Sequence, residues 1–282
     1  MGNIRFILSL TLLITSSFSG ISQTIDLKKY RSPFQSESVA IYLLNDDSLF
    51  QEKQNIVIAE YRKDAFRTYK IDIAYSDSLL KKTSRFGEDS NSLVALNGSF
   101  FDVQKGGSVT YLESDGHIVA RNRSSKENWA KTDSLLNGAI VLKKSGKLQI
   151  EIAKNSAYYE QSDKEKAVMV SGPILLVDGR KLPLENSDFV KKRHPRSCVC
   201  KTSTNSILFI AIDGRSKSAS GMNLFELQQF LLRINCIDAI NLDGGGSTTL
   251  WVNDGIEKKI LNHPSDKEGE RSVANILLIK NK

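Results

Sequence analysis

The sequence is poor in the features that mark several specialised classes of protein. It has only 3 cysteines and 5 prolines in 282 residues, and its 18 glycines follow no regular period. Few cysteines exclude a disulfide-rich scaffold, and the lack of a glycine period excludes a collagen-like chain. No internal repeat or heptad run is present, which excludes repeat architectures and long coiled coils. The hydrophobic share of 40% allows a globular core, in one large domain or two small ones.

Charge of one sign does not dominate either. The 39 lysines and arginines are set against 32 aspartates and glutamates, which leaves a net charge of +7. The densest basic cluster, residues 191–194, is short, and the remaining basic residues are scattered along the chain. This balance is compatible with anionic small ligands but does not predict a nucleic-acid partner.

Long apolar runs are absent except near the N-terminus. There, Arg5 precedes an apolar run over residues 6–14, and small residues follow up to Ser22. This order is typical of a secretory signal peptide, here residues 1–22, cleaved before Gln23. The run is too short to span a bilayer. We therefore expect an exported protein, periplasmic or extracellular, without stable membrane insertion.

Short apolar and alternating runs after residue 38 predict a sheet-dominated α+β fold with few helices. Expected strands cover residues 39–44, 56–61, 69–75, 93–96, 139–142, 148–152, 168–170, 174–177, 207–212, 237–240, 250–252, 256–261 and 273–279. The clearest helix follows Asn223, and the polar stretches 121–134 and 153–166 read as exposed loops or short helices. Residues 23–90 form either N-terminal strands or a small module, and residues 91–282 form the main domain.

The three cysteines leave several pairings open. Cys198 and Cys200 are two residues apart, so on a strand they would share one face. With Cys236 the count is odd, which allows one disulfide in an oxidising compartment without showing which pair forms it. We interpret all three as buried free thiols.

The strongest chemical signal is the run Asn241-Leu242-Asp243-Gly244-Gly245-Gly246-Ser247, directly after a predicted buried strand. Consecutive glycines let the backbone approach a ligand closely, and their amides can form a nest for an oxyanion. The spacing differs from a P-loop, and the P-loop lysine is missing. We therefore expect Asp243 to lie beside an anion-binding turn.

Polar segments elsewhere supply further candidates. Asn97-Gly98 follows a second short buried strand, and His194-Pro195-Arg196 places a guanidinium, whose fork suits phosphate, on a constrained backbone. Asp213 and Arg215 follow the 207–212 strand. Glu226 lies three residues after Asn223, which fits a capping box better than a catalytic carboxylate.

Together and in this order, these segments resemble the phosphodiester glycosidase family over roughly residues 90–280. The residues that carry the resemblance are Asn97–Phe101, His194–Ser197, Asp213–Arg215, Gly221-Met222 with Glu226, Asn241–Ser247, Asn262 and Glu270–Asn275. The resemblance implies a hydrolase that cleaves a glycosyl-1-phosphodiester into free sugar and a phosphomonoester. A glycan or sugar phosphate would be its substrate.

The resemblance also suggests roles for the candidate residues. Asp243, Asp213 and Glu226 would be the catalytic carboxylates, with Asp243 first. Phosphate would be bound by Arg196, Arg215 and the Gly244, Gly245 and Gly246 backbone, with Ser247 and Gly98 beside them. Sugar hydroxyls would be bound by Asn97, Asn241 and Asn262. Arg271 would bind substrate, or pair with Glu270 or Asp243 and orient the site.

Three points stay open at this stage. The sequence identifies no definite cofactor, and a divalent cation near Asp243 is compatible with it. Retention and inversion cannot be distinguished without the separation of the carboxylates. A non-catalytic carbohydrate- or phosphate-binding protein and a phosphodiesterase that breaks the P–O bond are the alternative functions.

Overall fold

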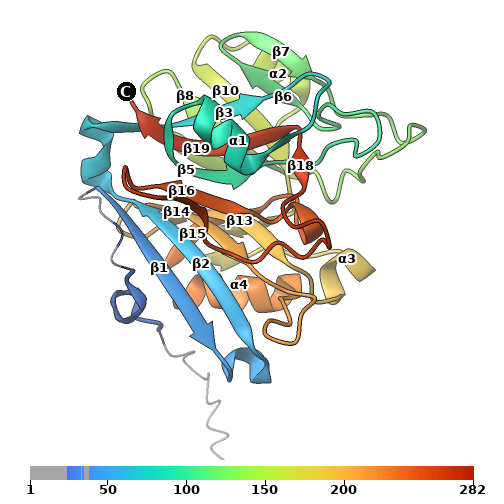
Figure 1. Ribbon diagram of the computed structural model, residues 1–282. Coiled ribbons are helices and arrows are strands. Elements are labelled where there is room, and N and C mark those ends of the chain that lie inside the picture. Colours follow the sequence, from blue (N-terminus) through green and yellow to red (C-terminus); the bar gives the residue numbers. More distant parts are fainter. Residues whose placement is uncertain (1–23, 33, 35–37) are drawn as a thin grey trace, which may run out of the picture.

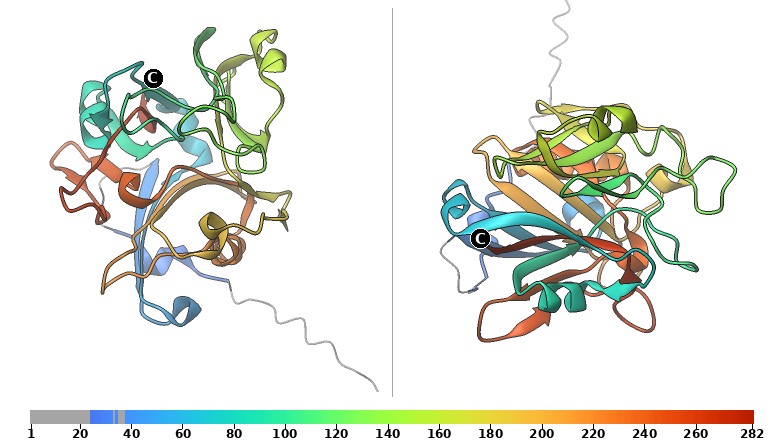
Figure 2. Two further views of the ribbon diagram at one scale, coloured as in Figure 1. Left: turned by 90° about the vertical axis from the view of Figure 1, so that its right-hand side faces the viewer. Right: turned by 90° about the horizontal axis from the view of Figure 1, so that it is seen from above.

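The computed structural model describes residues 24–32, 34 and 38–282, so the predicted signal peptide lies outside the described residues. Three antiparallel sheets surround one apolar interior (Figures 1 and 2). The seven-stranded sheet runs β1 (Val39–Asp46), β2 (Gln54–Tyr61), β14 (Ile207–Ile212), β13 (Arg196–Thr202), β15 (Cys236–Asn241), β11 (Ile174–Val177) and β12 (Arg180–Lys181).

Two five-stranded sheets close the other sides of the interior. One runs β7 (His117–Ala120), β6 (Leu112–Ser114), β10 (Glu165–Ser171), β8 (Gly138–Lys143) and β9 (Leu148–Ile152). The other runs β17 (Lys258–Ile260), β16 (Leu250–Asn253), β5 (Ser92–Asn97), β19 (Asn275–Asn281) and β3 (Tyr69–Tyr75). A two-stranded sheet pairs β18 (Ser272–Val273) with β4 (Lys81–Lys82).

Few helices accompany these sheets. The described residues contain α1 (Thr83–Asp89), α2 (Ser156–Glu160), α3 (Asp188–Lys191) and α4 (Leu224–Arg233). The short 3-10 helices are η1 (Leu27–Tyr30), η2 (Leu49–Gln51), η3 (Lys63–Arg67) and η4 (Gly245–Ser247). The sheet-dominated α+β class is therefore confirmed.

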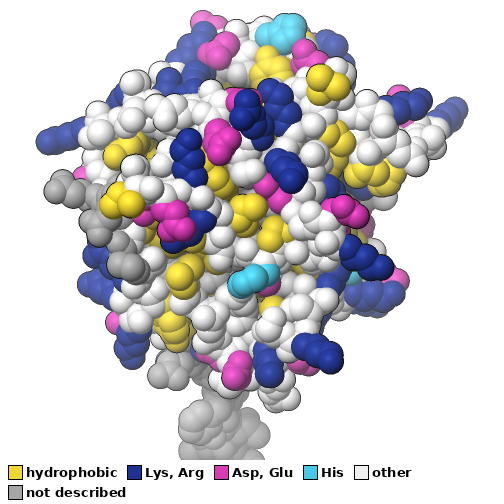
Figure 3. Space-filling model, in the orientation of Figure 1, with side chains coloured by type: hydrophobic (Ala, Val, Ile, Leu, Met, Phe, Trp, Pro, Cys, Tyr) yellow, Lys and Arg dark blue, Asp and Glu magenta, His cyan; other side chains and the backbone are white. Residues whose placement is uncertain are grey.

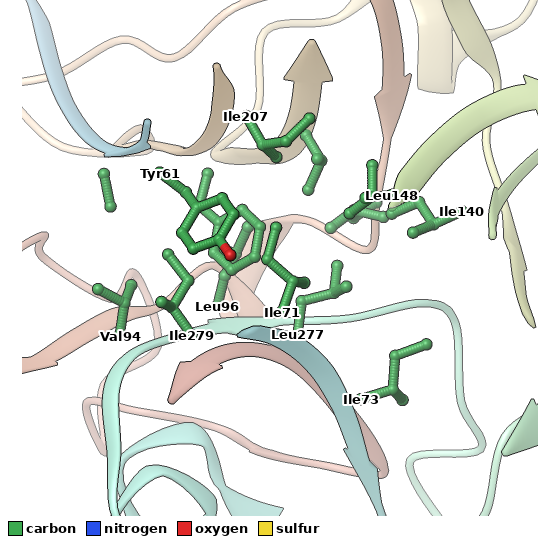
Figure 4. Packing of buried hydrophobic residues seen from close by; sticks show 14 of the residues in the cluster. Tyr61, Ile71, Ile73, Val94, Leu96, Ile140, Leu148, Ile207, Leu277 and Ile279 are labelled. Carbon is green, nitrogen blue, oxygen red and sulfur yellow. The ribbon is translucent and has the colours of Figure 1, made fainter. Parts of the chain in front are cut away.

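The apolar strands are buried on both faces, which explains their nearly continuous hydrophobic runs. In β14, Ile207, Phe209 and Ala211 point into the interior shared by the three sheets, where Tyr61, Leu148 and other side chains meet them (Figure 4). The alternate β14 residues face outward and pack under α4. A period of two in a strand produces this division.

The helix α4 forms where the sequence predicts it. Its apolar residues Leu224, Leu227, Phe230 and Leu231 pack on the outer face of the seven-stranded sheet. Asn223 accepts a hydrogen bond from the Glu226 amide, and the Glu226 carboxylate accepts one from the Asn223 amide. The capping box is therefore confirmed.

The structure corrects three expectations from the sequence. Cys200 and Cys236 form a disulfide between neighbouring strands, so only Cys198 is a buried free thiol. The expected strand 273–279 is divided into β18 and β19. The expected strand 256–261 shortens to β17 because Ile256 lies in the turn, 86% exposed.

The strands before residue 90 pair with strands from the end of the chain. β2 pairs with β14, and β3 pairs with β19.

On the face shown in Figure 3, basic side chains are interspersed with acidic ones and form no continuous stripe. No helix in the described part of the chain is long and apolar enough to cross a membrane.

Candidate active site

The candidate active site is a pocket of about 260 Å³ at one end of β13 and β15, beside α3. Because β13 is antiparallel to both β14 and β15, its start meets the ends of its two neighbours at this edge, where Arg196 pairs with Ile212 and Cys198 pairs with Asn241. The predicted segments therefore converge although they lie far apart in the sequence. The pocket is lined by Phe189, His194, Pro195, Arg196, Arg215, Asp243, Gly244, Gly245, Gly246 and Arg271.

The glycine turn forms one wall of this pocket, and each glycine is needed for its close contacts. A side chain at Gly244 would place its Cβ 2.6 Å from the carbonyl oxygen of Pro195. Gly245 has a φ of +63°, and its amide donates to the same Pro195 oxygen over 2.9 Å. A side chain at Gly246 would place its Cβ 2.1 Å from Oδ1 of Asp266. Successive amides in a turn of this kind can form a nest for an anion.

Asp243 is the only carboxylate among the described residues that line the pocket. Burial raises the pKa of its carboxyl above the usual value, while the Ser247 hydroxyl, Lys131, Arg271 and the Gly244 amide act in the opposite direction. The Ser247 hydroxyl is itself buried, with no hydrogen-bond partner of normal geometry in the described chain. A raised pKa makes the Asp243 carboxylate a stronger proton acceptor than an ordinary aspartate.

Asn97 and Gly98 form hydrogen bonds with the backbone of Asp243. The Asn97 side-chain amide donates to the Asp243 carbonyl over 2.7 Å, and the Asp243 amide donates to the Gly98 carbonyl over 3.1 Å. The Asn97 oxygen accepts from the Ser197 hydroxyl and the Thr249 amide. Asn97 is fully buried and positions the Asp243 backbone, and its expected contact with a sugar stays a prediction.

Arg196 is the most deeply buried cation of the site, with 1% of its surface exposed. Its Nε donates to the Met222 carbonyl, and its Nη2 donates to the Phe189 and Lys192 carbonyls. The guanidinium also lies 4.8 Å from the centre of the Phe189 ring. Burial, assisted by the nearby charge of Arg215, lowers the pKa of Arg196 to about 9. An anion in the pocket would reverse this penalty.

Two more arginines line the same pocket. Arg215 lies over Gly245 and approaches the His194 ring, with 3.3 Å between Nη2 and Nδ1. Burial, followed by the charges of Arg196 and Arg215, lowers the pKa of His194 and favours its neutral form. Arg271 donates from Nε and Nη2 to both Asp266 oxygens, at 2.7 and 3.0 Å.

The observed partner of Arg271 corrects the expected pairing with Glu270 or Asp243. The Glu270 carboxylate instead accepts from the amide and hydroxyl of Ser84. Arg271 nevertheless lines the pocket, so its expected place near substrate is compatible with the structure.

Two of the three candidate carboxylates lie outside the pocket. Asp213 accepts from the Asn262 side chain and the His263 amide, and it also contacts the His263 ring and Asn55. Glu226 caps α4, and Arg193 binds both of its oxygens. Both carboxylates have structural partners, so the structure does not favour their predicted catalytic roles.

Asn241 and Asn262 are also occupied by the backbone. The Asn241 amide donates to the carbonyls of Gly172 and Leu242. The Asn262 amide donates to Asp213 and to the Thr248 carbonyl, and its oxygen accepts from the Leu250 amide. Both are buried, neither is among the residues that line the pocket, and the Asn241 oxygen has no hydrogen-bond partner in the described chain. Their expected role as sugar ligands stays a prediction.

The sequence analysis missed two residues near the site. Phe189 of α3 forms part of the wall, and its ring lies edge-on to Phe100 at 6.2 Å between centroids. The Lys131 ammonium lies 5.1 Å from the centre of the Phe100 ring and acts on the charge of Asp243. Lys131 belongs to the polar stretch 121–134, in which no pattern distinguishes it from its neighbours.

A metal site is not evident from side chains alone. Within the described ranges, no group of three or more histidine, cysteine, aspartate or glutamate side chains is placed to hold an ion. The positive lining and the glycine turn fit an anion, and phosphate in particular suits the forked guanidinium groups.

The chain resembles known proteins in both sequence and structure. Residues 90–280 match the phosphodiester glycosidase family. The N-acetylglucosamine-1-phosphodiester alpha-N-acetylglucosaminidase of Bos taurus is 24% identical over 192 residues, which cover 63% of this chain and 33% of that protein. The chain thus spans about a third of the length of this relative.

Solved structures share the fold. The catalytic domain of the zebrafish N-acetylglucosamine-1-phosphodiester alpha-N-acetylglucosaminidase superposes with a TM-score of 0.67 at 21% identity, covering 88% of this chain and 85% of that chain. A hypothetical protein from Synechocystis superposes with a TM-score of 0.58 at 13% identity, covering 88% and 63%. At these identities the likeness concerns the fold.

Proposed function

The chain belongs to the phosphodiester glycosidase family, and from this premise we propose that it hydrolyses the C1–O bond of a glycosyl-1-phosphodiester. One observation carries the proposal most directly. A pocket is lined by Arg196, Arg215, Arg271 and a glycine turn, and Asp243 is the single carboxylate among the described residues that line it. The arginines and the turn fit the phosphodiester, and the carboxylate serves the chemistry beside it.

A single carboxylate suffices because of the leaving group. Ordinary glycosidases use two carboxyl groups, one of which protonates the departing oxygen. A phosphomonoester is a weak base and leaves without strong acid assistance. Asp213 and Glu226 are therefore not needed in the pocket.

The proposed reaction replaces the C1–O bond to phosphate with a C1–O bond to water, in one displacement or in two. In a single displacement, Asp243 accepts a proton from a water molecule whose oxygen bonds to C1. In a double displacement, an Asp243 oxygen first bonds to C1 as the phosphate leaves; water then forms its own bond to C1, breaks the ester bond to Asp243 and gives up its proton to solvent. The electron pair of the C1–O bond leaves with the phosphate, and the arginines stabilise the charge that develops there. The products are a free sugar and a phosphomonoester.

Hydrolysis in water labelled with heavy oxygen tests the bond that breaks. The purified protein is incubated with a panel of sugar-1-phosphodiesters, with and without a chelator, and the products are analysed by mass spectrometry. Label in the sugar supports C1–O cleavage. Label in the phosphate would mean that the P–O bond breaks, so that the protein is a phosphodiesterase and not a glycosidase. Binding of substrates without release of product from any of them would favour a non-catalytic binding protein.

Export of the protein is a second part of the proposal. The signal-peptide pattern of residues 1–22 supports it, and so does the Cys200–Cys236 disulfide, because such bonds persist in oxidising compartments. N-terminal sequencing of the protein recovered outside the cytoplasm should give Gln23 as its first residue. Recovery of an intact Met1 terminus from the cytoplasm would contradict export.

A further inference from the structure

We propose that the chain binds one small anionic amphiphile in a second cavity, at the end of β13 and β14 opposite Asp243. This cavity has a volume of about 370 Å³. Lys201 lines it from near the end of β13, whereas Arg196 begins the same strand at the active site. Five residues of strand separate them, roughly 17 Å. The inference does not depend on the proposed hydrolysis.

The cavity lies where the shared interior of the three sheets opens to solvent. The end of β2, the helix η3 and the start of β3 line one side. The β8–β9 turn and the β13–β14 turn line the others. Figure 4 shows Tyr61, Leu148 and Ile207 among the interior side chains, and all three reach this opening.

The floor of the cavity is apolar. Tyr61, Leu148 and Ile207 are each at most 3% exposed, and Phe66 packs edge-on against Tyr61 with 5.2 Å between ring centroids. The Tyr61 hydroxyl donates to the Tyr69 carbonyl over 2.8 Å, so it presents no free donor to a ligand. Such a floor suits a hydrocarbon or aromatic body.

The walls of the cavity are basic. Lys63, Lys70, Lys147 and Lys201 line it, and no aspartate or glutamate side chain does so among the described residues. Lysine stems extend the apolar wall while the ammonium groups stay in water at its edge. Lys282 also lines it.

One of the four wall lysines has an acidic partner at this edge. Asp238 forms an ion pair with the Lys201 ammonium at 3.9 Å, and Glu151 shares an adjoining cleft with Lys147 and Lys201. Glu151 already pairs with Lys154 and accepts from the Tyr159 hydroxyl. Lys63 and Lys70 have no ion-pair partner within the part of the chain that the structure describes.

These features together fit a molecule with an apolar body and one anionic head. The volume falls in the usual range for small-molecule sites, about 300–1,000 Å³. A membrane surface fits less well, because no large apolar side chain that the structure shows exposed belongs to this cavity. A bilayer would need protruding side chains, whereas a single amphiphile can enter the recess.

Calorimetric titration of the full chain with decanoate tests the proposal. We expect saturable binding of one decanoate per chain, and displacement by decanoate of the fluorescent probe anilinonaphthalene sulfonate. Decyltrimethylammonium has the same tail with a cationic head, and acetate has the head without the tail. Equal binding of either, or binding only to vesicles of anionic phospholipid, would overturn the proposal.

A matched pair of charge variants locates the site. The double variant Lys63→Glu/Lys147→Glu reverses two exposed lysines of the cavity, and decanoate affinity should fall at least tenfold. The control Lys144→Glu/Lys181→Glu reverses two exposed lysines outside it, and affinity should change less than twofold. Thermal melts check that both variants are folded, and Lys63→Gln/Lys147→Gln replaces the first variant if it is not. Equal affinities in the cavity and control variants would refute the location.

Discussion

Raising the pH through 9 should weaken phosphate binding because the Arg196 guanidinium loses its proton there. Its pKa is lowered to about 9 by burial first and by the charge of Arg215 second. Ordinary arginines keep their protons far above this pH. A phosphomonoester has its second pKa at about 6 and stays a dianion throughout the experiment.

The size of the effect follows from the fraction of protein that carries the proton. With a pKa of about 9, about nine-tenths of the molecules are protonated at pH 8 and about one-tenth at pH 10. If binding requires the charge, the apparent Kd for methyl phosphate should rise about tenfold between these values. Isothermal titration calorimetry at constant ionic strength measures this Kd at each pH.

The variant Arg196→Met supplies the reference for this experiment. It should bind methyl phosphate weakly, and the ratio of its Kd to that of the wild type should shrink as the pH rises from 8 to 10. The substitution also leaves three carbonyls without their donor, at a cost on the order of 1–3 kcal/mol each, so the titration belongs well below its Tm. A ratio that stays constant across this range would refute the role assigned to Arg196.

Three further predictions concern other parts of the molecule. Burial raises the pKa of Asp243 in the folded protein, so the contribution of this carboxyl to stability is lost as the pH rises through that pKa. The difference between the wild-type Tm and the Tm of Asp243→Ala should therefore shift in favour of the variant between pH 4 and pH 8. A difference that stays constant would argue against a raised pKa. Replacing Cys200 and Cys236 by alanine should lower the free energy of unfolding by about 4 kcal/mol for a loop of 36 residues, measured by denaturant titration, and a change below about 1 kcal/mol would contradict this. Lys131→Ala should move the acid-side midpoint of kcat/KM to higher pH, because Lys131 lowers the pKa of the Asp243 carboxyl. Lys126→Ala in the same stretch should leave the midpoint unchanged.

The strand pattern was predictable because both faces of the long strands are buried. The apolar run 207–212 coincides with β14, and the capping box at Asn223 coincides with the start of α4. Shorter strands such as β6 and β12 were missed, since they alternate with turns and carry little hydrophobic signal. The strand 256–261 was overestimated because an apolar Ile256 occupies an exposed turn.

The sequence predicted several residues that line the candidate site, but it did not show which predicted residues contact the pocket and which bind the backbone. The glycine turn was predictable from its consecutive glycines, and Arg196 from its guanidinium next to a proline. Both line the pocket. Asparagine in a turn can bind either a sugar or the backbone, and only the fold shows that Asn97 and Asn262 bind the backbone. Sequence spacing likewise cannot show which carboxylates have structural partners.

Long-range contacts set the remaining limit. The Cys200–Cys236 disulfide depends on β13 and β15 becoming neighbours, although 36 residues separate the two cysteines in the sequence. Lys131 reaches the site only because its loop packs over Phe100. Neither residue pair has a local pattern from which the contact could be derived.

Turnover by the wild type and by Asp243→Ala, measured on the same sugar-1-phosphodiester, tests the central claim most directly. In parallel, the binding of methyl phosphate to both proteins is measured as a probe of phosphomonoester product binding. Loss of the carboxylate should reduce kcat on the order of 10²–10⁴-fold, while the phosphomonoester still binds through the arginines. Release of free sugar by Asp243→Ala at the wild-type rate would contradict the account.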